Sequence, residues 1–133
     1  MQGDANMRKE TRKYICAELL HYQQTHKDIE RLKSKLEDMR LYTAFRQEYT
    51  TEQAIYLTER LRWCRQVTGA IAKVYAESSK EEKEVIQLKF WSPKPRPTDS
   101  SIASQLGMST STMYRIINSI CKRIAMQLGL DTQ

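Results

Sequence analysis

Side chains of the types that read DNA bases recur along one short segment near the C-terminus. An arginine such as Arg115 can bond guanine through two donors, and an asparagine such as Asn118 can pair in the same way with adenine. Hydroxyl groups suit base edges or phosphates. The predicted contact residues of this segment are Ser109, Thr110, Ser111, Tyr114, Arg115 and Asn118. The absence of acidic side chains among them is consistent with a surface that contacts DNA.

Two short helices joined by a sharp turn would place these side chains together on one outward face. Ala103 is small where the helices approach each other, and Gly107 suits the left-handed backbone of the turn. Ser109 offers a side-chain oxygen to cap the second helix. The predicted packing residues are Ile102, Leu106, Met113 and Ile116. The pattern predicts a helix-turn-helix that places its second helix in the major groove; the alternative is an ordinary helical hairpin.

The charge around this segment favours the same interpretation. Between residues 92 and 124 the only acid is Asp99, and the cations are Lys94, Arg96, Arg115, Lys122 and Arg123. The whole chain of 133 residues carries a formal net charge of +6. Because neutralising phosphates supplies most non-specific affinity for DNA, we expect Lys94, Arg96 and Lys122 to contact the backbone.

The residues before this segment predict a helix and then a connector. Ser79 and Glu82 have the spacing of a capping box ahead of an apolar run. The alternating prolines of residues 93–97 exclude a helix and predict an extended connector. Thr98 or Asp99 then caps the following helix.

The run from Ser78 to Gly129 resembles region 4 of bacterial sigma factors, and still more the phage transcriptional activators of the RinA/ArpU type. The residues that match are Ile86, Leu88, Lys89, Phe90, Ile102, Ala103, Leu106, Ser109, Tyr114 and Arg115. Ala17–Lys33 resembles the opening helix of that family. The chain departs from the family at Glu37–Thr51, where relatives have a longer segment containing Gly and Ser.

This resemblance implies an all-α protein with a C-terminal helix-turn-helix domain like sigma factor region 4. It implies a sequence-specific regulator that binds double-stranded DNA without enzymatic activity, and that activates late genes for phage packaging and morphogenesis. The likeness to sigma factors leaves an alternative, which is a subunit that acts only through bound host RNA polymerase.

The N-terminal half predicts long helices. Residues 7–40 contain no Gly or Pro, and apolar residues recur along them with partial heptad spacing: Ile15, Tyr22, Ile29, Leu32, Leu36 and Met39. This stripe either holds a homo-oligomer, most simply a dimer, or packs on residues 52–77 of the same chain. A second helix is expected over Thr51–Ala76, where Gly69 marks an interruption, a bend or a close helix contact. The predicted domains are residues 1–50 for assembly, 51–78 as a connecting helix and 79–133 for DNA binding.

Other kinds of chemistry have little support in the sequence. Cys16, Cys64 and Cys121 are widely spaced and are expected to act as small buried hydrophobes. We find no catalytic constellation and predict no metal or cofactor site. A mean hydropathy of −0.67 argues against a membrane span. The N-terminus does not resemble a signal peptide, so we expect a protein of the host bacterial cytoplasm.

Overall fold

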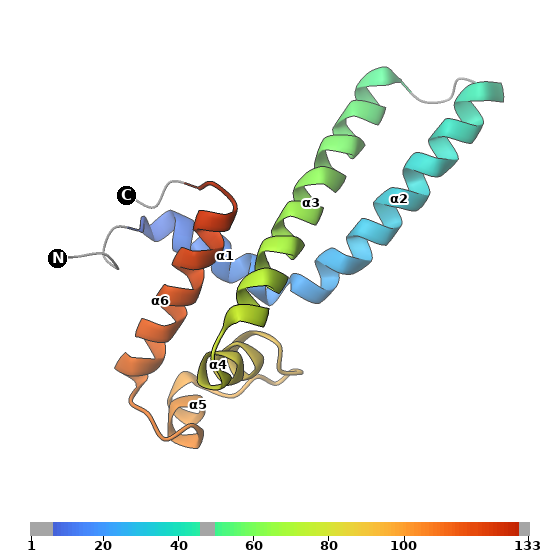
Figure 1. The fold of residues 1–133 in the computed structure, drawn as a ribbon. Helices are drawn as coiled ribbons and strands as arrows, with labels where there is room; N and C mark the ends of the chain where they lie inside the picture. Colours follow the sequence, from blue (N-terminus) through green and yellow to red (C-terminus); the bar gives the residue numbers. More distant parts are fainter. Residues whose placement is uncertain (1–6, 46–49, 131–133) are drawn as a thin grey trace. The chain divides into compact units, whose positions relative to one another are not determined.

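The computed structural model describes residues 7–45 and 50–130, and in these ranges the fold is all-helical (Figure 1). The helices are α1 (Lys9–Leu20), α2 (Tyr22–Phe45), α3 (Thr51–Glu77), α4 (Lys80–Phe90), α5 (Asp99–Gln105) and α6 (Thr110–Gln127). The described residues include no β-strand, which confirms the predicted all-α class. None of these helices combines the length and the apolar character needed to cross a membrane.

The helices belong to two compact units. The C-terminal unit comprises Met1–Leu20 and Ala70–Gln133, and the hairpin unit comprises His21–Gly69. Helix α3 contributes to both units, because its last turns lie beyond Gly69. The predicted domain boundaries at residues 50 and 78 stay a prediction, since a compact unit is not thereby shown to fold by itself.

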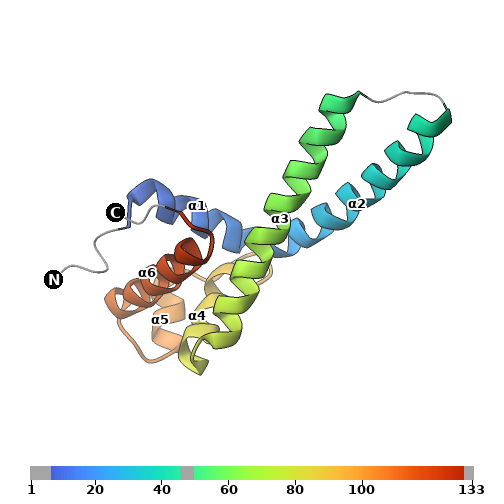
Figure 2. The ribbon, with the colours of Figure 1, turned by 45° about the horizontal axis from the view of Figure 1, so that its top comes forward.

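The core of the C-terminal unit forms around α6, which contacts α1, α4 and α5 (Figure 2). Apolar side chains on one face of α6 are buried, because they recur at the spacing that keeps one side of a helix toward its neighbours. The buried side chains from these four helices are Ile15, Leu19, Val85, Ile86, Phe90, Ile102, Ala103, Met113, Ile117, Ile120, Cys121, Ile124 and Ala125.

Trp91 joins the ends of three helices in this unit. Its indole Nε1–H donates to the carbonyl oxygen of Leu19 at 2.9 Å, at the end of α1. Its ring packs on the ring of Tyr75 in α3, with 5.0 Å between the centroids. A tryptophan suits this position because its large apolar ring carries one polar group that must find an acceptor when partly buried.

The hairpin unit consists of α2 and the part of α3 up to Gly69. Ile29 and Leu32 of α2 form a buried cluster with Leu61 and Cys64 of α3. Leu36 and Leu57 pack against this cluster. Three residues of the predicted stripe, Ile29, Leu32 and Leu36, therefore pack on α3 within the chain.

Two expectations about helix continuity are wrong. Residues 7–40, which lack Gly and Pro and whose apolar stripe favours an unbroken helix, are interrupted at His21, between α1 and α2. The apolar residues on its two sides are buried in different units, and Thr25 Oγ1 donates to the His21 carbonyl oxygen at 3.0 Å beside the interruption. The expected interruption of the second helix at Gly69 is absent, because α3 continues through it. A Cβ at Gly69 would have no heavy atom within 4 Å, so Gly69 does not mark a close contact either.

Candidate nucleic-acid interface

The turn between α5 and α6 is built from backbone hydrogen bonds at the end of α5. The N–H of Gly107 donates to the carbonyl of Ser104 at 3.1 Å, and the N–H of Met108 donates to that of Ala103 at 2.9 Å. This pair of bonds is the Schellman arrangement, which requires a left-handed residue after the C-cap. Gly107 supplies that residue with a φ of 69°. The predicted left-handed turn is thereby confirmed.

Helix α6 begins at the cap that the sequence predicts. The Ser109 hydroxyl oxygen accepts the backbone N–H of Thr112 at 3.1 Å and donates to the Thr112 hydroxyl at 3.0 Å. At the start of α5 the cap is Thr98, whose side chain accepts from the N–H of Ser101 at 3.1 Å. Both helices therefore have defined first turns, which fix the backbone that carries the side chains near the start of α6.

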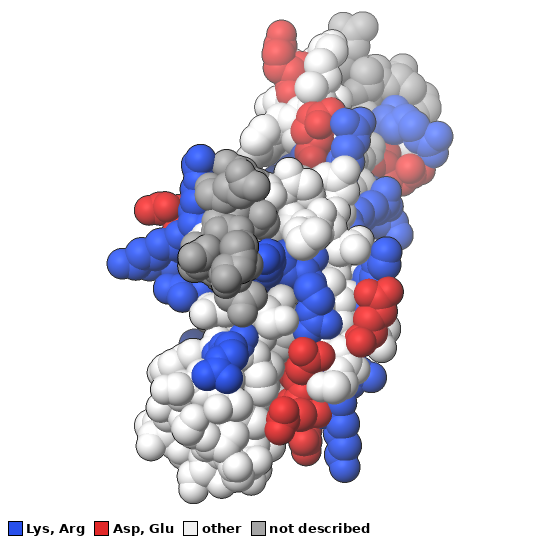
Figure 3. Space-filling view, turned by 60° about the vertical axis from the view of Figure 1, so that its left-hand side comes forward, with Lys and Arg blue, Asp and Glu red and all other residues white. Residues whose placement is uncertain are grey.

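The first turns of α6 expose hydroxyl groups and one arginine. Thr110, Ser111 and Arg115 are exposed, while Met113 faces the core with 0% of its surface accessible. Among the described residues Arg115 makes no hydrogen bond or ion pair. The lower left of the surface in Figure 3, at the height of α5 and the start of α6, shows almost no charged side chains, whereas acidic and basic side chains lie at the lower right. The uncharged part offers neutral donors and acceptors instead.

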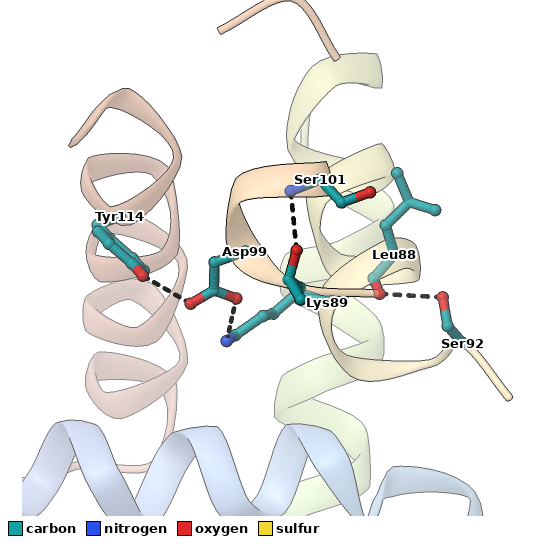
Figure 4. Close-up of polar contacts among 7 residues, drawn as sticks. Leu88, Lys89, Ser92, Asp99, Ser101 and Tyr114 are labelled. Atoms are coloured by element: carbon teal, nitrogen blue, oxygen red, sulfur yellow. Dashed lines mark hydrogen bonds and ion pairs between the residues drawn. The ribbon is translucent and has the colours of Figure 1, made fainter. Parts of the chain in front are cut away.

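Tyr114 is held by a hydrogen bond to α5. Its hydroxyl donates to Asp99 Oδ2 at 2.6 Å, and the other carboxylate oxygen of Asp99 pairs with Lys89 Nζ of α4 at 2.6 Å (Figure 4). Lys89, and then Tyr114, hold the pKa of Asp99 below its usual value, and the carboxylate raises the pKa of Tyr114. The three groups tie α4, α5 and α6 together, and the Tyr114 hydroxyl is engaged within the chain although the side chain is exposed.

Asn118 lies beside α1 rather than on the fully exposed face. Its side chain is half-buried, and its Oδ1 accepts from Arg12 Nη1 at 3.3 Å. The two residues line an open groove of about 400 Å³ with Cys16, Lys89, Tyr114 and Ile117. Arg12, which is 106 residues away from Asn118 in sequence, thus lies beside a predicted contact residue.

The predicted phosphate-binding cations are in different surroundings. Lys94 and Arg96 are exposed on the connector between α4 and α5, whereas Lys122 is half-buried on α6. Arg123, which contributes to the charge of this region, pairs with Glu82 at 2.7 Å and is directed toward α4. Of the predicted phosphate-binding cations, the two on the connector are therefore exposed and the one on α6 is not.

Helix α1 and the residue before it carry cations close to α6 in the fold but far from it in the sequence. Lys9 and Lys13 are exposed on α1, which contacts α6, and the exposed Arg8 directly precedes this helix. Lys and Arg side chains gather at the height of α1 in Figure 3, above the uncharged lower left. No sequence pattern within either helix predicts that α1 packs on α6. The basic character of residues 8–13 is the one feature of the sequence that could have indicated this surface.

Comparison of the chain with protein-family models, with curated proteins and with solved structures found no match.

Proposed function

We propose that this protein is a sequence-specific, non-enzymatic regulator of transcription that binds double-stranded DNA through α5 and α6. In this proposal α6 lies in the major groove with its first turns toward the base edges. Thr110, Ser111 and Arg115 contact bases, and Lys94 and Arg96 contact phosphates.

One observation carries the proposal, namely the combination of the Gly107 turn with the neutral, capped start of α6. Groove-reading helices need a fixed first turn, donors and acceptors that match base edges, and positive charge nearby for the backbone. The caps at Thr98 and Ser109 supply the fixed geometry, and the exposed hydroxyls supply the donors and acceptors. The connector and α1 supply the charge.

The biological setting rests on the resemblance to activators of the RinA/ArpU type. It suggests that the DNA target lies before late genes of a bacteriophage and that the protein acts in the host cytoplasm. A homo-oligomer, most simply a dimer, is part of the proposal, because one such unit reads few base pairs. The Ile29 and Leu32 side chains are buried within the chain, so that dimer needs another surface.

The test is selection of duplexes from a random-sequence DNA pool with the purified full-length protein. We expect enrichment of a defined motif that the protein binds at least a hundredfold more tightly than a scrambled duplex, without any partner. Enrichment only when core RNA polymerase is added would support the sigma-like alternative. No enrichment under either condition would contradict both functions.

We expect Arg115→Ala to lower affinity for the selected duplex by about 5- to 150-fold, because a good bidentate base contact is worth about 1–3 kcal/mol. Arg115 is exposed, so the variant should keep the parent's melting temperature and circular dichroism. Fluorescence anisotropy with the selected and scrambled duplexes measures both affinities. Arg60→Ala, an exposed arginine of α3 in the hairpin unit, is the matched control. Equal loss on both duplexes would show that Arg115 contacts phosphate and not a base.

A further inference from the structure

Two cysteines that are 105 residues apart in sequence meet in the C-terminal unit. Sγ of Cys16 in α1 lies 3.7 Å from Sγ of Cys121 in α6, and both are free thiols. Cys121 is fully buried, whereas Cys16 is half-buried. A disulfide needs about 2.05 Å between the sulfur atoms. Joining them therefore requires side-chain rotation and movement of α1 on α6 that bring the two sulfur atoms closer together.

Cys16 lines the open groove described above, together with Arg12 of α1 and Lys89 of α4. The groove gives a small oxidant a path to Cys16 but not to the buried Cys121. The hydrogen bond from Cys121, and then the charges of Arg12 and Lys89, lower the pKa of Cys16 to about 7, against the opposing effect of burial. The same hydrogen bond and burial raise the pKa of Cys121, so Cys121 keeps its proton. The two thiols therefore have different chemical roles.

We propose that Cys16 is a peroxide-reactive thiol and that Cys121 resolves its oxidised form into a disulfide that fastens α1 to α6. The Cys16 thiolate attacks one oxygen of hydrogen peroxide, the O–O bond breaks, and hydroxide leaves. The sulfenic acid is then attacked by Cys121 sulfur, the S–O bond breaks, and the released hydroxide takes the Cys121 proton as water. In total, two thiols and one peroxide give one disulfide and two waters.

The chemistry depends on the packing of α1 on α6 and not on the proposed function. An effect of the disulfide on DNA binding would rest on that function, since Cys16 shares its groove with Tyr114 and Asn118. Cys64 is buried in the hairpin unit and is an internal reference thiol within the same chain.

The test treats reduced full-length protein with a small excess of hydrogen peroxide and then alkylates it for non-reducing peptide mapping. We expect an intramolecular Cys16–Cys121 link, Cys64 still reduced, and a higher melting temperature that returns to its starting value with dithiothreitol. The rate should be half-maximal near pH 7 and fall at lower pH, because protonation removes the thiolate. Arg12→Ala should move that midpoint upward.

Two variants separate the roles of the thiols. Cys121→Ser should leave a sulfenic acid at Cys16 that dimedone traps, and Cys16→Ser should slow peroxide consumption at least tenfold. If Cys121→Ser does not fold, the wild-type peptide map and pH profile still show whether Cys16 reacts with peroxide and forms the disulfide with Cys121. Links between chains, oxidation of Cys64 as fast as Cys16, or three thiols that survive peroxide would overturn the proposal. Because the peroxide experiment contains no DNA, a negative result in it does not contradict the proposed DNA-binding function. A negative result in the DNA selection likewise does not contradict the disulfide proposal.

Discussion

Gly107 shows how one residue controls the direction of a helix. Its φ of 69° lets two N–H groups close the end of α5, and α6 begins only three residues later. A Cβ at this position would meet no heavy atom within 4 Å, so steric crowding by neighbours does not explain the glycine. The requirement comes from the backbone alone, because residues with a Cβ are strained at positive φ.

We expect Gly107→Ala to lower the free energy of unfolding by about 1–2 kcal/mol, the usual strain of an L-residue in the left-handed region. Gly69→Ala is the matched control, because Gly69 lies in a helix and has space for a Cβ. That variant should raise stability by about 0.5–1 kcal/mol, since glycine weakens helix interiors. Urea unfolding followed by circular dichroism measures both. Equal effects of the two alanines would contradict the assigned role of the turn.

At the scale of elements, the long helices α2 and α3 depend on each other. The apolar side chains of α2 are spaced for one face, and that face packs on Leu61 and Cys64 of α3. A heptad-like stripe alone is compatible with either a partner chain or a partner helix, since both bury the same side chains. From the intramolecular packing we expect the α2 part of the stripe to be required for folding of the hairpin unit.

We expect the double variant Ile29→Asp and Leu36→Asp to unfold the hairpin unit, because each change loses apolar packing and introduces a carboxylate into or beside the buried cluster. The helical signal in circular dichroism should fall. Ile55→Asp is the control and should have little effect, since Ile55 is 57% exposed. A double variant that keeps its helicity but elutes as a smaller species would instead show that the stripe holds two chains together.

At the scale of the whole molecule, the net charge is +6, but some of the cations are paired with carboxylates and others are exposed. Lys89 and Arg123 are engaged by Asp99 and Glu82 within the C-terminal unit. Lys94 and Arg96 are exposed on the connector, and further exposed cations lie on α1. Affinity for DNA that comes from phosphate contacts should therefore depend on the connector and decrease with salt.

We expect Lys94→Ala with Arg96→Ala to weaken binding to all duplexes alike and to reduce the slope of log affinity against log salt by about 2, because each phosphate contact releases about one counterion. Titrations between low and moderate salt measure the slope. The control removes the same charge from α2 with Arg31→Ala and Lys33→Ala, whose side chains pair with Asp28 and Glu30. An unchanged slope in the connector variant would exclude both cations from the interface.

The sequence by itself determined the features that depend on near neighbours along the chain. The capping box of Ser79 and Glu82, the cap at Ser109 and the left-handed Gly107 are all present where the pattern predicts them. Each depends on hydrogen bonds or backbone preferences within a few residues, so residue type and spacing suffice. The all-α class follows for the same reason, because long segments without Gly or Pro favour helices.

Only the tertiary structure decided which distant segments meet. The contact of Arg12 with Asn118, the approach of Cys16 to Cys121 and the bond from Trp91 to Leu19 each join residues more than 70 positions apart. The interruption at His21 belongs to the same group, since no local breaker is present and two different cores bury the flanking apolar residues. Such contacts arise from the packing of whole helices, and no local pattern of residues encodes which helix faces which.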